Sequence, residues 1–296
     1  MGGRLEGKVA LVTGAARGMG ESHVRLFAEE GAAAVLSDVR DRLGERSAAS
    51  LVREGHRAAY LSLDVTRAAD WERAIGFVES EFGALHILVN NAGVVATSDA
   101  LTETEEGWDR VVAVNQTRAF LGMRHAVPAL RRAGGGAIVN VASNLGLVGS
   151  AGYFAYQASK GALVQMTRAA GIAYAGDGIR VNSVCPGLVM TPMAEEEGPE
   201  SNAVFVAATP MGRAGEQLEV SRAVLFLASD EASYITGAEL GLPQVWVSRE
   251  LRAFRRVRRR GGRQPHEPCR SPPSISALVR RRVRDDVTPQ GKPRPT

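Results

Sequence analysis

The stretch "YFAYQASK", residues 153–160, places two tyrosines upstream of one lysine. Tyr156 precedes Lys160 by four residues, a spacing that puts both side chains on one face of a helix, about 5–6 Å apart at Cβ. Tyr153 lies two turns from Lys160, and is expected in the wall of a substrate pocket or in packing. An ammonium beside a phenol stabilises the phenolate and lowers its pKa from about 10, which makes Tyr156 a candidate general acid and base.

Two polar residues further upstream make this pair more specific, because the same spacing is common on the surfaces of amphipathic helices. Ser143 ends the apolar run "AIVNVAS", a predicted strand over 137–143. Parallel sheets bind ligands at the carboxyl ends of their strands, so the Ser143 hydroxyl is placed to hydrogen-bond a substrate carbonyl or hydroxyl. Asn115 in "AVNQT" has an amide that could hold a water. The candidate catalytic residues are therefore Asn115, Ser143, Tyr156 and Lys160.

A glycine-rich turn, "TGAARGMG", follows the first apolar run, residues 8–13, and opens a helical segment. Gly14, Gly18 and Gly20 have three physical uses in such a place: a tight turn, close approach of backbone to a pyrophosphate, and close packing of helix on strand. The helix N-terminus adds free N–H groups for the phosphates. The spacing G-x-x-x-G-x-G differs from the commoner G-x-G-x-x-G, and a turn without a ligand stays the alternative.

Two charged residues bear on which nicotinamide cofactor this turn would hold. Asp38 ends the second predicted strand, eighteen residues after Gly20. A carboxylate there accepts hydrogen bonds from the adenosine ribose and repels a 2′-phosphate, which favours NAD over NADP. Arg17 in the turn favours NADP instead, since a basic residue can hold a 2′-phosphate. Asp38 is given the greater weight.

Apolar runs alternate with helical periods along the chain. Strands are predicted over 8–13, 33–38, 57–63, 86–90, 137–143 and 179–185, and helices near 41–54, 67–82, 107–132 and 154–175. This alternation predicts an α/β fold, a doubly wound parallel sheet covered by helices on both faces. The segment 193–210, polar and dotted with Gly and Pro, is expected to form a mobile lid.

Composition separates an acidic body from a basic tail. Residues 242–296 carry 15 Lys and Arg against 4 Asp and Glu, a net charge of +11, and hold 8 of the 13 prolines. Residues 1–241 carry a net charge of −7. The tail is expected to be disordered. Arginine-rich segments bind phosphate without sequence preference, but no nucleic-acid reading module accompanies this one, so nucleic-acid binding is not expected.

The remaining totals exclude several classes of protein. Two cysteines cannot form a disulfide framework. The N-terminal "MGGRLEGK" has no hydrophobic signal region, and the apolar runs are too short to span a bilayer. The five histidines show no metal-ligand spacing. A cytoplasmic protein without a metal site or a membrane span is expected.

The motifs together resemble the short-chain dehydrogenase/reductase family over residues 5 to about 241. They are, in order, "TGAARGMG", "LDV", "NNAG", "VN" with Asn115, "VAS" with Ser143, "YQASK" and "PGLVMT". The resemblance implies a single Rossmann-like NAD-binding domain over 1–241 and hydride transfer between the nicotinamide and a carbonyl or alcohol carbon. It also implies a homotetramer in which the helices at 107–132 and 154–175 pair across a two-fold axis, so a dimer or tetramer is expected.

The resemblance implies a role for each matching residue. Tyr156 is the acid and base, Lys160 lowers its pKa and binds the nicotinamide ribose, Ser143 orients the substrate oxygen, and Asn115 holds a proton-relay water. Asp64 and Val65 contact adenine, Asn91 lines the ribose side, and Val189 and Thr191 grip the carboxamide. The cofactor-binding set implied is Gly14, Arg17, Gly18, Met19, Gly20, Asp38, Asp64, Val65, Asn91, Ala92, Gly93, Tyr156, Lys160, Pro186, Gly187, Val189 and Thr191.

Longer stretches, such as "IRVNSVCPGLVMTPM" and "SDEASYITGAEL", resemble bacterial 3α(or 20β)-hydroxysteroid dehydrogenases within the family. The segments expected to touch substrate, 144–153 and 193–210, are apolar at "LGLVGSAGYF" and "AVFVAA", which suits an apolar alcohol or ketone. A 3-oxoacyl thioester reductase is the alternative enzyme, and Asp38 argues against its usual NADPH. A non-catalytic nucleotide-binding protein is the alternative of another class, and the complete catalytic set argues against it.

The resemblance stops abruptly after "TGAEL". Relatives continue with a last strand that ends in an Asp-Gly-Gly turn, whereas this chain has Pro243, which removes a ladder donor. The last strand is therefore expected to be altered or missing. A reading-frame shift in the coding sequence is the hypothesis for residues 242–296, with a natural basic extension as the alternative.

Overall fold

The computed structural model describes residues 2–243, and the elements in this range alternate as the sequence predicts. The strands are Val9–Thr13 (β1), Ala33–Asp38 (β2), Ala58–Ser62 (β3), Ile87–Asn90 (β4), Gly136–Val141 (β5), Ile179–Pro186 (β6) and Glu239–Leu242 (β7). The helices are Gly18–Glu29 (α1), Asp41–Arg53 (α2), Ala68–Phe82 (α3), Glu105–Val112 (α4), Arg118–Arg132 (α5), Phe154–Tyr174 (α6), Pro192–Glu197 (α7), Pro199–Ala208 (α8) and Gln217–Ala228 (α9).

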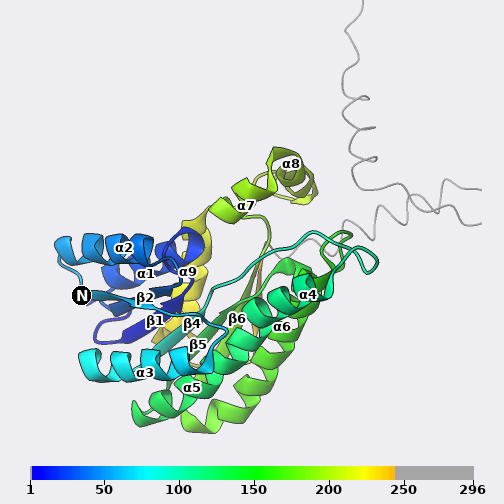
Figure 1. The fold of residues 1–296 in the computed structure, drawn as a ribbon. Coiled ribbons are helices and arrows are strands. Elements are labelled where there is room, and N and C mark those ends of the chain that lie inside the picture. Colours follow the sequence, from blue (N-terminus) through cyan, green and yellow to red (C-terminus); the bar gives the residue numbers. More distant parts are fainter. Residues whose placement is uncertain (1, 244–296) are drawn as a thin grey trace, which may run out of the picture.

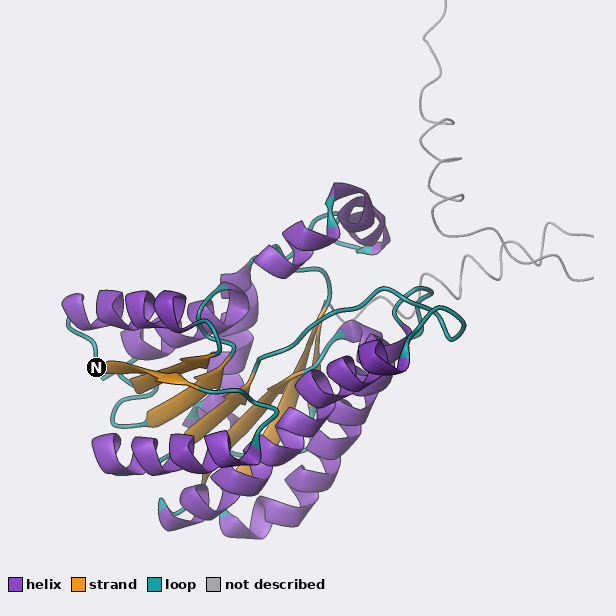
Figure 2. Cartoon of the chain, viewed as in Figure 1, coloured by secondary structure: helices purple, strands orange, loops and turns teal. Residues whose placement is uncertain are grey.

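The strands form one parallel sheet in the order β3-β2-β1-β4-β5-β6-β7. Figure 2 shows this sheet in orange between helices. The chain moves outward from β1 to β3, then returns to the other side of β1 and continues outward from β4. The strand order therefore reverses between β1 and β4, and open sheets of this kind bind ligands at the carboxyl ends of the strands at such a point. The predicted doubly wound, Rossmann-like sheet is confirmed.

Helices cover both faces of the sheet, with α1, α2 and α9 on one face and α3, α5 and α6 on the other (Figure 1). Strand β1 shows why, because its side chains alternate between two cores. Ala10 and Val12 pack in the core that contains Phe27 of α1, and Val9 and Leu11 pack in the core that contains Trp71 of α3. Strands that are apolar on both faces are typical of parallel sheets.

The long helix predicted over 107–132 is interrupted. A π-helical segment, Ala113–Thr117, separates α4 from α5, and the N–H of Arg118 donates to the carbonyl of Ala113, five residues back. Such segments occur mostly as single-turn bulges and often at functional sites. Here the segment contains the candidate residue Asn115.

The segment 193–210, predicted to be a mobile lid, contains most of the two short helices α7 and α8. Thr191 caps α7 by accepting a hydrogen bond from the N–H of Ala194 at 3.3 Å. Helix α8 follows directly after Gly198, and both helices lie beyond the carboxyl end of β6 (Figure 1).

The last strand, expected to be altered or missing, is present over Glu239–Leu242, so it is not missing, and with four residues it is short. It pairs in parallel with β6, and the Arg168–Glu239 ion pair at 2.7 Å ties it to α6. The strand has four residues and stops directly before Pro243, which lacks the N–H that a continued ladder needs. The predictions for the tail concern residues that, apart from 242 and 243, lie outside the described range, and they stay predictions.

Candidate active site

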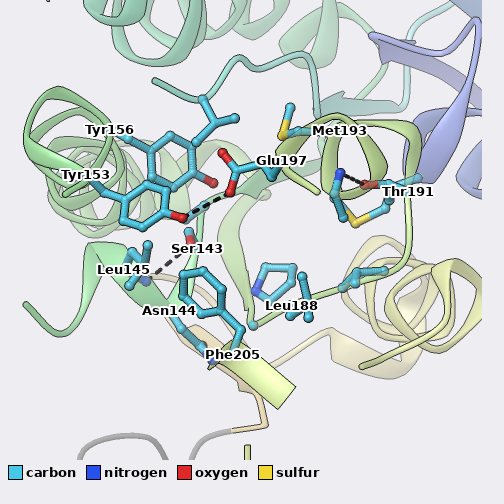
Figure 3. A pocket seen from close by; sticks show the side chains of 17 residues that line it. Ser143, Asn144, Leu145, Tyr153, Tyr156, Leu188, Thr191, Met193, Glu197 and Phe205 are labelled. Atoms are coloured by element: carbon cyan, nitrogen blue, oxygen red, sulfur yellow. Dashed lines mark hydrogen bonds between the residues drawn. The ribbon is translucent and has the colours of Figure 1, made fainter. Parts of the chain in front are cut away.

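A pocket opens at the carboxyl end of the sheet, between the ends of β5 and β6, helix α6 and the two short helices (Figure 3). Ser143 lies two residues after the end of β5, and Tyr156 projects from the first turn of α6. Most of the wall is apolar, and it includes Val95, Leu145, Leu188, Met193 and Phe205. The structure thus brings two of the candidate catalytic residues into one apolar pocket.

Lys160 lies beneath Tyr156, one turn further along α6. Its Nζ atom lies 5.6 Å from the centroid of the Tyr156 ring and donates to the carbonyl of Val141, at the end of β5, at 2.9 Å. The lysine is buried, with 3% of its surface exposed. The i,i+4 spacing read from the sequence is therefore realised, and the ammonium is tied to the last residue of β5, two residues before Ser143.

The electrostatics differ from the expected effect of Lys160 on Tyr156. Burial raises the pKa of Tyr156, and a hydrogen bond with Ser143 opposes this rise. Burial also lowers the pKa of Lys160 to about 7, because its charge is costly in an apolar surrounding. The cation that lowers the pKa of Tyr156 in this structure is Arg118, while the Glu197 carboxylate raises it.

Asn115 is fully buried and uses its side-chain amide to join two segments. Its Oδ1 accepts from the N–H of Val94 at 2.9 Å, and its Nδ2 donates to the carbonyl of Val94 at 2.8 Å and to Oγ of Ser159 at 3.2 Å. The amide thus fixes the loop after β4 against α6, beside Lys160. The expectation that Asn115 holds a water stays a prediction.

Tyr153 forms part of the pocket wall, as predicted. Its hydroxyl donates to Oε2 of Glu197 at 3.0 Å (Figure 3). The same hydroxyl lies 3.3 Å from Oγ of Ser201. The ring packs edge-on against Phe205 of α8, with centroids 5.7 Å apart. Tyr153 therefore joins the start of α6 to α7 and α8.

The glycine turn after β1 has the shape that a pyrophosphate site needs. A Cβ on Gly20 would lie 2.2 Å from the carbonyl oxygen of Gly14, so only glycine allows this approach of α1 to the turn. The Asn91 amide braces the turn by donating to the carbonyls of Thr13 and Gly14 at 2.9 and 3.1 Å. Within residues 2–243, no side chain caps the N-terminus of α1, which leaves its first N–H groups for an anion.

Asp38 lies at the end of β2, beside the same turn. Its carboxylate accepts from the N–H groups of Ala16 at 3.2 Å and Arg40 at 3.0 Å, so its position is fixed by two backbone donors. Arg17 is directed elsewhere and pairs with Glu196 of α7 at 2.8 Å. The geometry supports the greater weight given to Asp38.

The other predicted cofactor residues fall into two groups. The Asp64 carboxylate accepts hydrogen bonds from the N–H and the hydroxyl of Thr66, at 3.0 and 2.7 Å. The neighbouring Val65 is buried. Ala92 and Gly93 continue from Asn91 along the loop after β4. Five further residues of the set line the pocket itself: Met19, Pro186, Gly187, Val189 and Thr191.

Comparison with known proteins agrees with this geometry. The chain matches a family model described as enoyl-(acyl carrier protein) reductase over residues 14–242. It is 46% identical over 241 residues to 3-alpha-(or 20-beta)-hydroxysteroid dehydrogenase of Mycobacterium tuberculosis, covering 81% of this chain and 89% of that protein. It is 45% identical over 240 residues to cyclopentanol dehydrogenase of Comamonas sp., covering 80% and 96%.

The fold has matching relatives among solved structures. A crystal structure described as a short-chain dehydrogenase/reductase from Burkholderia xenovorans superposes with a TM-score of 0.76 at 37% identity, over 81% of this chain and 96% of that one. The chain belongs to the short-chain dehydrogenase/reductase family. The resemblance drawn from the motifs is confirmed, and so is the prediction that the protein is an enzyme.

Sequence reasoning missed two charged residues of this short-chain dehydrogenase/reductase. Arg118 follows Asn115 by three residues and is fully buried, and none of its guanidinium nitrogens has a hydrogen-bond partner in residues 2–243. The sequence pattern that could have identified Arg118 is a single charged residue on a helix face that otherwise holds small and apolar residues. Glu197 ends the run "EEE", which reads as a solvated surface, and only the fold turns its last member into the pocket.

No group of three or more His, Cys, Asp and Glu side chains in residues 2–243 could hold a metal ion. No helix in the same range combines the length and the apolar character needed to cross a bilayer.

Proposed function

We propose that the protein is an NAD-dependent oxidoreductase that interconverts a secondary alcohol and a ketone, with ring alcohols as the preferred class. The observation that carries this proposal is the placement of Tyr156 and Ser143 in the wall of an apolar pocket that adjoins the glycine turn, with Lys160 buried behind the Tyr156 ring. The names of the two relatives, a cyclopentanol and a hydroxysteroid dehydrogenase, support a ring substrate. A hydroxysteroid is one member of the proposed class.

The residues of the pocket divide the work of such a reaction. NAD, held by the glycine turn and Asp38, would accept or return the hydride. Ser143 hydrogen-bonds the substrate oxygen, and Tyr156 takes the hydroxyl proton during oxidation or returns it during reduction. Lys160 fixes the helix that bears Tyr156 against β5, and the apolar wall excludes water from the reacting carbon.

A substrate panel with two cofactors tests the proposal. Purified protein is assayed with NAD and NADP against cyclopentanol, cyclohexanol, a 3α-hydroxysteroid and a 20-oxosteroid, and against a 3-oxoacyl thioester. Turnover of at least one ring alcohol with NAD is expected. Turnover confined to the thioester with NADPH would instead establish the thioester reductase, and nucleotide binding without any turnover would favour the non-catalytic alternative.

Cofactor choice gives a sharper prediction. With Asp38 intact, kcat/KM is expected to favour NAD over NADP by at least about tenfold, roughly 1.4 kcal/mol. The carboxylate is held by two backbone N–H groups and cannot turn away from a 2′-phosphate. Asp38→Ala is expected to narrow the gap, because Arg40, now 3.6 Å from that carboxylate, is left for the phosphate. A preference of the unmodified protein for NADP would refute the assignment.

Assembly is expected to involve the outer face of α6. This face carries Phe154 and Ile172, which are 48% and 82% exposed, and between them the small residues Ala158, Gly161, Ala162 and Ala169. Small side chains let a helix from a second copy approach closely. We expect at least a dimer by light scattering at micromolar concentration, and dissociation on Ala162→Arg. A monomeric mass for the unmodified protein would contradict this prediction.

A further inference from the structure

One carboxylate stands out in the apolar wall of the pocket. Glu197, the last residue of α7, lies opposite Ser143, and its side chain points toward the hydroxyl groups of Tyr153 and Tyr156 (Figure 3). The two glutamates before it, Glu195 and Glu196, are exposed. The fold therefore directs one member of the acidic run, and not its neighbours, toward the reacting groups.

This carboxylate is only partly satisfied by the protein. Its Oε2 accepts from the Tyr153 hydroxyl at 3.0 Å, and among residues 2–243 no hydrogen bond reaches Oε1. A carboxylate offers about four acceptor positions. Arg17, which precedes α1, pairs with the neighbouring Glu196 at 2.8 Å. Glu197 thus presents an acceptor oxygen and a negative charge to whatever fills the pocket.

We propose that Glu197 is a specificity residue that accepts a hydrogen bond from a second hydroxyl group of the substrate, so that ring diols are preferred over simple ring alcohols. The inference rests on the proposed function and names its substrate class more closely. The first hydroxyl meets Ser143 and Tyr156, and the second meets Oε1 of Glu197. A hydrogen bond to a charged acceptor in a partly dry pocket is stronger than a neutral one, which is enough for at least tenfold discrimination.

The surroundings of Glu197 favour a neutral donor over an ion. The rest of the wall, including Leu188 and Phe205, is apolar, and an ammonium would lose its hydration there with one carboxylate as compensation. A substrate carboxylate would meet a like charge. A diol has neither the desolvation cost of an ammonium nor the repulsion between two carboxylates. Amino alcohols and ring acids are therefore expected to be poorer substrates than the matching diols.

The experiment compares kcat/KM for cyclohexanol with that for the 1,2-, 1,3- and 1,4-cyclohexanediols, at saturating NAD. The best diol is expected to exceed cyclohexanol by at least about tenfold. Glu197→Met, which keeps the length and removes the acceptor, is expected to bring this ratio close to one, and Glu197→Gln to an intermediate value. The ratio is the readout because any effect of Glu197 on Tyr156 changes both substrates equally and cancels.

Two matched variants separate recognition from a structural role. Glu196→Gln changes the neighbouring carboxylate, which faces Arg17, and is expected to leave the diol ratio unchanged. Tyr153→Phe removes the hydrogen bond to Oε2 but keeps the acceptor, and is expected to keep the preference as well. Thermal unfolding of each variant shows whether α7 remains in place.

The outcomes are distinguishable. An unmodified enzyme that turns over cyclohexanol and the diols equally well, or a diol ratio that survives Glu197→Met, overturns this inference and leaves the proposed function standing. A higher kcat/KM for trans-4-aminocyclohexanol than for the best diol overturns the choice of a neutral donor. Absence of turnover on every alcohol with NAD refutes the proposed function itself.

Discussion

Replacing Tyr156 with phenylalanine is expected to lower kcat by about 10²–10⁴-fold, the usual contribution of a positioned acid and base. The change removes one oxygen and leaves the ring above Lys160, 5.6 Å from its Nζ atom. The glycine turn and Asp38 are untouched, so the Kd for NAD, measured by fluorescence titration, is expected to stay within about twofold. A loss confined to kcat identifies a group that acts in the chemical step.

Tyr153→Phe is the matched control, since the two tyrosines lie three residues apart at the same end of α6. This change removes the hydrogen bond to Glu197 and the contact with Ser201 and leaves the proton path intact. Turnover is expected to stay within about tenfold of the unmodified enzyme. Equal losses from the two substitutions would remove the basis for choosing Tyr156.

The second large effect is expected from Arg118→Met, and it is a gain in stability of roughly 1–4 kcal/mol at pH 7. Arg118 is fully buried without a hydrogen-bond partner in the described residues, and burial lowers its pKa to about 9. A guanidinium in this position is still charged at neutral pH and carries its full desolvation cost. Methionine fills similar space without that cost.

The pH dependence of this gain follows from the direction of the shift. The folded pKa, about 9, lies below the ordinary value of 12.5, so the unfolded chain binds more protons between these values and stability rises with pH there. The penalty is therefore fully present below pH 9 and is relieved above it. Urea unfolding is expected to show the same gain at pH 6 and pH 8 and a smaller one at pH 10.

Arg180→Met is the control for Arg118→Met, with the opposite expected sign. The Arg180 guanidinium donates to the carbonyls of Leu227 and Ser229 at 2.7 and 2.9 Å, so its removal leaves acceptors without partners. A loss of stability is expected from this variant. If Arg118→Met destabilises the protein to a similar degree, Arg118 is not an uncompensated buried charge.

Arg118→Met is also expected to change the pH profile. The Arg118 cation lowers the pKa of Tyr156, so its loss raises that pKa further. Alcohol oxidation needs the phenolate, and the rising limb of kcat against pH is therefore expected to move to higher pH. An unchanged limb would show that Arg118 has no electrostatic effect on the reacting group.

Much of the fold was predictable because it depends on short-range patterns. The strand 33–38 was predicted with the bounds that the structure shows, and helix 154–175 differs by one residue at its end. Apolar runs and turn glycines are local signals. The carboxyl edge of a parallel sheet then brings Ser143 and Tyr156 together without any further information.

Other features depend on packing and could not be read from spacing. The π-helical segment at Asn115 interrupts a pattern that is typical of one helix, and the Asn115 amide in it is hydrogen-bonded to Val94, in the loop after β4. The last strand forms in spite of the approaching Pro243 because its four residues still find the open edge of β6. Neither the π-helical segment nor the last strand is indicated by a pattern in the local sequence.

The sequence by itself determined the sheet, the glycine turn and the identity and spacing of the tyrosine–lysine pair, because each depends on residues close together in the chain. The charge balance around Tyr156, by contrast, depends on how the folded chain packs. The fold buries Lys160 so that its pKa falls to about 7, places Arg118 in the interior and turns Glu197 toward the pocket. The energy of a charge is set by its distance from water and from other charges, and both are fixed by contacts between segments far apart in sequence.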